Sequence, residues 1–81
     1  MKIAEKRHWT PGGDLHTTES LHRSRTRWFV RTESVLAASD GDEETVDPDE
    51  ARMFCAEAGD WRFTFGGDVH SETLQPVEFP A

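Results

Sequence analysis

The residues with the clearest chemical character in this sequence are acidic and lie close together. Such a run of carboxylates repels itself unless it is solvated or paired with cations. Placed along a loop and a first helical turn, carboxylates can stand in for phosphates and occupy the basic groove of a nucleic-acid-binding protein. The plainer alternative is a solubilising loop followed by a helix N-terminus that favours negative charge. Seven carboxylates fall within eleven residues: Asp40, Asp42, Glu43, Glu44, Asp47, Asp49 and Glu50.

Metal chemistry is the third option for these carboxylates, and the sequence argues against it. Acidic side chains at alternate positions match the start of a calcium-binding EF-hand loop. However, Thr45 occupies the position where that loop needs glycine, and Ala51 occupies the position where it needs glutamate. His16 and His22 share a strand face but would lie about 20 Å apart, too far to bind one zinc ion. We therefore predict no metal site and no cofactor.

Basic residues gather in the other half of the chain. Residues 1–31 carry a formal charge of +4 and residues 32–81 a charge of −11, which gives the net −7 of the whole chain. Arginines paired with an aromatic side chain can contact phosphates and bases, or simply pair with the chain's own acids. The candidates for nucleic-acid binding share one parity along a predicted hairpin: Arg23, Arg25, Arg27, Phe29 and Arg31.

Catalytic motifs are absent. Cys55 falls in an apolar helical stripe, where a thiol is usually an inert small hydrophobe. The glycine pairs at 12–13 and 66–67 read as turns, because neither opens a helix as a phosphate-binding loop must. No pattern places a nucleophile on a strained turn. We therefore expect the protein not to be an enzyme.

The secondary-structure elements that must position these residues are predicted from the periodicity of apolar residues and from the turn-forming residues between them. We predict strands at 2–9, 15–21, 27–36, 60–65 and 69–74, a loop at 37–44 and an extended tail at 75–81. The helix prediction rests on Asp47 as N-cap, Pro48 at the first helical position and Glu50 as partner of the cap. Its apolar stripe is Ala51, Phe54, Cys55 and Ala58, with Gly59 as the exit.

These elements fit one small domain spanning residues 1–81. The order β-β-β-α-β-β predicts an α+β fold in which a small antiparallel sheet carries one helix packed on one face. Trp61, Phe63 and Phe65 alternate along one strand and should meet the helix stripe. No apolar run approaches the roughly 20 residues of a membrane span, and the N-terminus is too charged for a signal peptide. We expect a cytoplasmic protein that does not contact membranes.

In its small size, acidity, helix-and-sheet pattern and lack of catalytic motifs, the chain resembles the small phage-encoded anti-defence proteins, including anti-CRISPR and DNA-mimic inhibitors. The resemblance implies a protein-binding inhibitor whose acidic surface occupies the basic nucleic-acid-binding site of a partner. The alternative is a nucleic-acid-binding or antitoxin-like accessory protein that uses the arginine-rich hairpin. The sequence leaves open whether the chain forms a homodimer.

Overall fold

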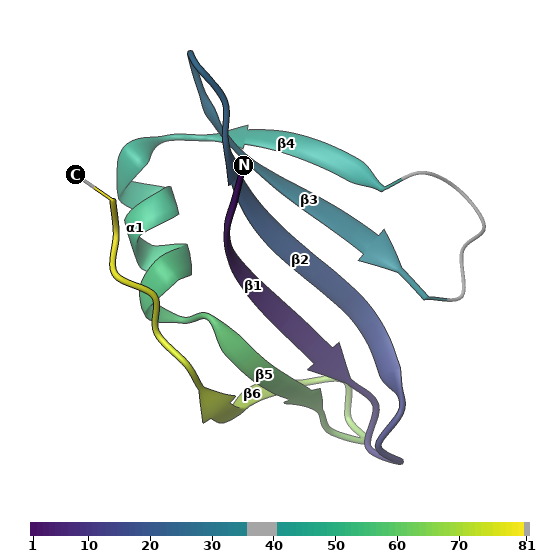
Figure 1. Cartoon of the computed structure of the whole chain (residues 1–81). Helices are drawn as coiled ribbons and strands as arrows, with labels where there is room; N and C mark the ends of the chain where they lie inside the picture. The colour runs from purple at the N-terminus through teal and green to yellow at the C-terminus, as the bar shows by residue number, and fades with distance from the viewer. Residues whose placement is uncertain (36–40, 81) are drawn as a thin grey trace.

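The computed structural model describes residues 1–35 and 41–80. Six strands form one sheet in the order β4-β3-β2-β1-β5-β6, and one helix packs on one face of it (Figure 1). The predicted α+β class is confirmed. No helix within these residues has both the length and the apolar character to cross a bilayer. The elements are β1 (Lys2–Trp9), β2 (Leu15–Arg23), β3 (Trp28–Ser34), β4 (Asp42–Val46), α1 (Pro48–Ala56), β5 (Gly59–Phe63) and β6 (Val69–Leu74).

The helix begins where the sequence predicted. The Asp47 carboxylate accepts a hydrogen bond of 2.8 Å from the backbone N–H of Glu50, and Pro48 occupies the first turn, where its missing N–H costs nothing. The predicted apolar stripe is buried. It consists of Ala51, Phe54, Cys55 and Ala58.

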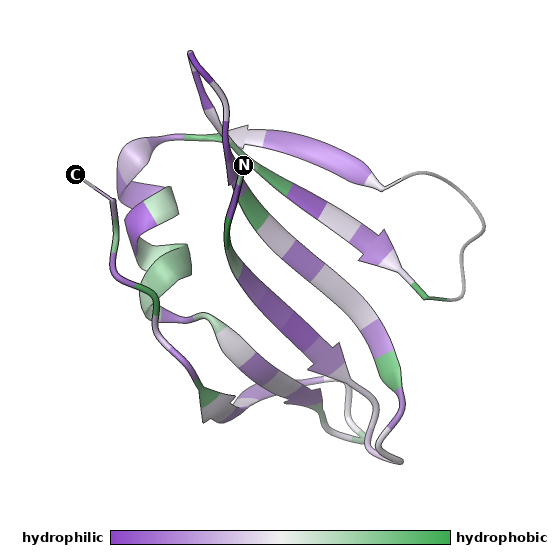
Figure 2. Ribbon diagram, in the orientation of Figure 1, coloured by the Kyte–Doolittle hydropathy of each residue, from purple (hydrophilic) through white to green (hydrophobic). Residues whose placement is uncertain are grey.

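The core lies between this stripe and one end of the sheet. Ala4 and Leu21 are partners on β1 and β2, and Leu21 has no exposed surface. Trp28 on β3 completes the buried sheet side. Figure 2 shows hydrophobic residues concentrated in α1 and the adjoining ends of the strands, while the rest of the sheet is mainly hydrophilic. The helix therefore covers only part of the sheet face on which it packs.

The predicted purely antiparallel sheet is wrong in one pairing. β1 and β5 run parallel, with Lys6 beside Gly59 and His8 beside Trp61, so the sheet is mixed. The cause is the path of α1, which carries the chain from edge strand β4 across the sheet face to the far side of β1. Three successive antiparallel pairings make β4 end at the end of the sheet where β1 begins, so the strand that follows α1 runs in the same direction as β1 and pairs with the edge that β2 leaves free.

The predicted loop at 37–44 is also wrong in its last residues, because Asp42 begins the additional strand β4. Residues 37–40 of that loop lie outside the described part of the chain. Acidic residues have low strand propensity, but β4 places Glu43 directly opposite Arg31 and Val46 opposite the buried Trp28. Opposite charges and apolar contacts across a strand pair stabilise a sheet, and these two pairs offset the low propensity.

The predicted aromatic strand face is only partly formed. β5 ends at Phe63, and the ring of Phe65 is 97% exposed in the turn that follows, so it does not meet the helix. Trp61 does reach α1, since its indole N–H donates a 2.8 Å hydrogen bond to the Glu57 carbonyl. Phe63 lies against the rings of His8 and His16 instead, at centroid distances of 5.9 and 5.2 Å.

The segment after β6 runs alongside α1 in the opposite direction and closes the core. Its backbone N–H groups at Gln75 and Val77 donate to the carbonyls of Ala58 and Cys55, at 2.7 and 2.9 Å. The ring of Phe79 stacks on Trp28 with centroids 5.0 Å apart. Residues 75–80 are thus extended, and their contacts hold them against the helix.

Candidate protein-binding surface

The acidic residues predicted to bind a partner lie along an edge strand and the first helical turn. We call the described members of this set the acidic edge. Asp40 falls outside the described residues. Because β4 is the last strand of the sheet, one side of it has no neighbouring strand among the described residues. The acidic edge consists of Asp42, Glu43, Glu44, Asp47, Asp49 and Glu50, all exposed.

Alternation along β4 divides the acidic edge between the two faces of the sheet. Val46 packs against the core, so Glu44 and Asp42, two and four residues before it, lie on the same face as α1. Glu43 lies on the opposite face, which we call the open face because no helix formed by the described residues covers it. The two faces therefore differ in what surrounds each carboxylate.

On the open face, Glu43 is neutralised by the chain itself. Its carboxylate lies 3.6 Å from the guanidinium of Arg27 and 4.0 Å from that of Arg31. Other acids on this face have basic partners as well, at distances of 2.7 to 3.2 Å. These pairs are Lys2–Glu5, Arg7–Asp60 and Arg62–Glu72.

On the α1 side the carboxylates are not neutralised in this way. Among the residues the structure describes, no ion pair forms to Asp42, Glu44, Asp47, Asp49 or Glu50. A hydrogen bond with Asp47 and the negative charges of Asp47 and Glu44 raise the pKa of Glu50 above its ordinary value. Asp47 is the main cause, and the negative charge of Glu44 adds a smaller contribution in the same direction.

A groove of about 330 Å³ opens between α1 and the uncovered part of the sheet face. Val30, Val46, Phe54 and the side chain of Met53, which is 64% exposed, supply its apolar lining. Its acidic lining comes from several parts of the chain, since Glu19 is on β2, Glu44 on β4, Glu50 in α1 and Glu57 just after α1. The remaining lining residue is Lys6. The groove thus combines four carboxylates with a single ammonium group.

Lys6 shows how this groove holds a cation. Its side chain is only 16% exposed, and its ammonium lies 3.5 Å from the Glu57 carboxylate. The same ammonium lies 4.8 Å from the ring centroid of Phe54 and 5.5 Å from that of Trp61. Aromatic faces and a carboxylate are the groups that attract a partly desolvated ammonium.

Glu19 has a different partner. Its carboxylate lies 2.5 Å from Nε2 of His8, and this hydrogen bond holds the pKa of Glu19 below its ordinary value against the opposing effect of burial. Sequence reasoning missed Lys6, Glu19 and Glu57 because their contribution depends on strand register and on the path of α1. The single local signal was that Lys6 and His8 would share a face of β1.

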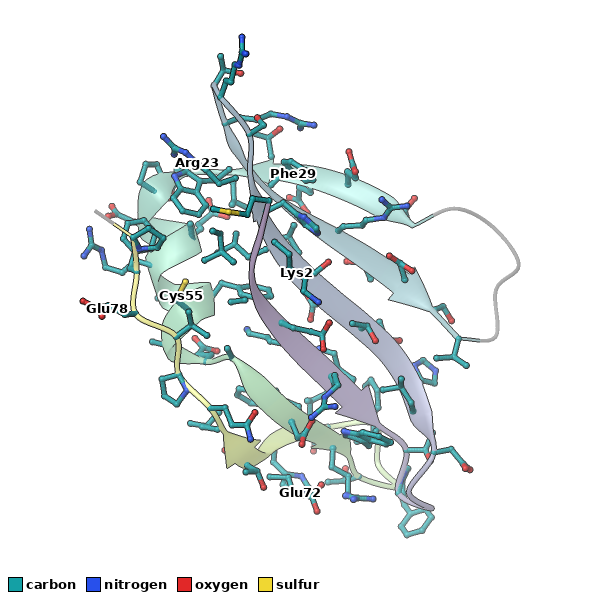
Figure 3. All side chains as sticks on the ribbon, in the orientation of Figure 1. Lys2, Arg23, Phe29, Cys55, Glu72 and Glu78 are labelled. Atoms are coloured by element: carbon teal, nitrogen blue, oxygen red, sulfur yellow. The ribbon has the colours of Figure 1, made fainter. Side chains whose placement is uncertain are left out.

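The predicted arginine stripe is not one surface. Arg23 lies over Trp28 on the α1 side, with its guanidinium 4.7 Å from the ring centroid, whereas Arg27 lies over Phe29 on the open face at 4.5 Å. Figure 3 shows Arg23 and Phe29 on different sides of the hairpin. Arg25 is exposed in the turn that joins β2 to β3. Arg31 joins the open-face ion pairs through Glu33 and Glu43.

Within residues 1–35 and 41–80, no three metal-ligating side chains come together. Cys55 is 1% exposed in the core, and burial raises the pKa of its thiol, which disfavours the reactive thiolate.

Comparison of the chain with protein-family models, with curated proteins and with solved structures finds no match. The geometry and charges described above therefore carry the functional argument.

Proposed function

We propose that the protein is a non-enzymatic binding module, an inhibitor whose acidic edge occupies the basic nucleic-acid-binding site of a partner protein. The observation that carries this proposal is the difference between the two faces of β4. On the open face Glu43 is paired with arginines of β3 and of the turn before it, while Asp42 and Glu44 on the α1 side have no cationic partner among the described residues. Carboxylates left without partners at the surface attract a cationic surface and orient its approach.

Position also favours this role. The acidic edge lies on an edge strand and at a helix end, so a partner can approach without displacing a neighbouring element. Asp47 serves the fold as well, since it caps α1, whereas Asp42, Glu44 and Asp49 accept no side-chain hydrogen bond from the described residues that would account for them structurally.

The test uses a fluorescein-labelled peptide of nine arginines as a stand-in for the basic partner, with fluorescence anisotropy read at 50 and 200 mM NaCl. We expect saturable binding that weakens at the higher salt concentration, because exposed charges are screened. The variant Asp42→Lys with Glu44→Lys should abolish binding, and the control Glu43→Lys should reduce it less, because Glu43 is already paired. Absence of binding by the unaltered chain at 50 mM NaCl would refute the proposal.

The second candidate function is nucleic-acid binding through the β2–β3 hairpin. Its turn projects beyond the sheet and carries Arg25, which has no ion pair among the described residues (Figure 1). A mobility-shift assay with duplex DNA and single-stranded RNA at about 100 mM salt separates the two functions. A complex that is lost in Arg25→Ala with Arg27→Ala would favour the hairpin over the acidic edge.

A further inference from the structure

The groove beside the acidic edge has a composition that a merely solubilising surface does not need. Its lining includes Val30, Val46 and Phe54, which are partly or wholly buried, and the acids lie around them. A surface that only repels other molecules would expose carboxylates to water without apolar side chains beneath them. A long side chain with an alkyl stem and a cationic end matches both parts of this groove.

The chain already places one such side chain there. Lys6 lines the groove with its side chain mostly buried and its ammonium near Phe54, Trp61 and Glu57. Glu19 is engaged by His8. The two remaining glutamates that line the groove, Glu44 and Glu50, form no ion pair with the described residues, so their negative charges are unmatched there.

We propose that the groove between α1 and the sheet seats a lysine or arginine side chain of the partner protein, with its stem on Val46 and Phe54 and its cationic group between Glu44 and Glu50. This inference rests on the proposed function and names the part of the acidic edge that recognises the partner. Met53 lies at the exposed rim, where its flexible thioether can adapt to the stem. A cation at this position would relieve the repulsion between the two glutamates.

Two double variants with the same change in net charge test this seat. Glu44→Gln with Glu50→Gln removes the two acids of the groove, and Asp42→Asn with Asp49→Asn removes two acids of the acidic edge that do not line it. For the nine-arginine peptide we expect about tenfold weaker binding in the groove variant and less than about threefold in the control variant. Thermal unfolding of both variants checks that the fold is unchanged.

Peptides that differ in the length of the alkyl stem provide a second test, because attraction between charges alone would not distinguish them. Nine-residue peptides of arginine, of lysine and of 2,4-diaminobutyric acid carry the same number of cationic side chains at pH 6, but the last has only two methylenes as its stem. We expect the unaltered chain to bind the first two at least about fivefold more tightly than the third. The groove variant should lose this preference.

The outcomes separate the two proposals. If no peptide binds the unaltered chain, the proposed function fails. If the peptides bind but the two double variants weaken binding equally, or stem length has no effect, the acidic edge acts as a diffuse charge and the seat in the groove is refuted. Unequal weakening together with a stem preference supports the seat.

Discussion

Replacing Phe79 by alanine should release the segment that follows β6 and destabilise the whole domain. The ring of Phe79 stacks on the buried Trp28, and the guanidinium of Arg52 lies 4.6 Å from its centroid on α1. Phe79 is partly buried, and its replacement by alanine removes on the order of 100 Å² of buried apolar surface. At about 25 cal/mol per Å² the loss is about 2.5 kcal/mol, part of which is returned by the greater freedom of the released segment. We expect a net loss of about 2 kcal/mol in the free energy of unfolding.

Urea unfolding followed by tryptophan fluorescence measures this loss. A domain of this size has about 4 to 12 kcal/mol of stability in total, so a loss of about 2 kcal/mol moves the midpoint clearly. The native emission should also shift to longer wavelength as Trp28 gains contact with water. Phe65→Ala is the matched control, because it removes the same ring from a position that is 97% exposed and should change stability by less than about 0.5 kcal/mol. Equal midpoints for the two variants would show that Phe79 does not hold the segment against the core.

Two further predictions concern the backbone and the pH dependence of stability. Gly59 has a φ of +129°, and a Cβ at this position would collide with the backbone at the end of β6. Gly59→Ala should therefore lower the thermal midpoint far more than the control Gly13→Ala, where φ is +95° but a Cβ would meet no atom within 4 Å. Similar midpoints for the two variants would contradict the close approach of the backbone to Gly59. The pKa of Glu19 is lowered in the folded state by His8, so its contribution to stability is present above its ordinary pKa of 4.5 and is lost as the pH falls through the lower folded value. Glu19→Gln should therefore weaken the acid dependence of urea unfolding below about pH 4.5, and an unchanged pH profile would argue against the pair.

The sequence was most informative where structure depends on neighbours along the chain. The helix follows from the cap at Asp47 and from an apolar stripe with helical spacing, and both are local properties. β4 was missed because its acidic residues become compatible with a strand only when Arg31 and Trp28 stand opposite them. That information lies in the pairing of two segments, which residue types and spacing do not provide.

The candidate site likewise has features that could be predicted from neighbouring residues and features that depend on the pairing of distant segments. The acidic edge was visible as a run of carboxylates, but which of them keep an unmatched charge depends on strand register, which gives Glu43 two arginines and Glu44 none among the described residues. The groove could not be predicted, because Lys6 and Glu57 meet across 51 positions of the chain. The predicted arginine stripe failed for a related reason: residues of equal parity lie on one face only while they belong to one strand, and Arg23 and Arg27 flank a turn.

The parallel pairing of β1 with β5 has a consequence during synthesis on the ribosome. β1, β2 and β3 leave the exit tunnel as a meander that can pair at once, but the second neighbour of β1 is joined through contacts such as Arg7 with Asp60, 53 positions later. Until that part has been translated, Leu21 and one side of β1 remain uncovered on the nascent chain. We therefore expect cooperative folding to begin only after β5 and β6 have left the exit tunnel, and until then the charged open face should keep the nascent meander dispersed.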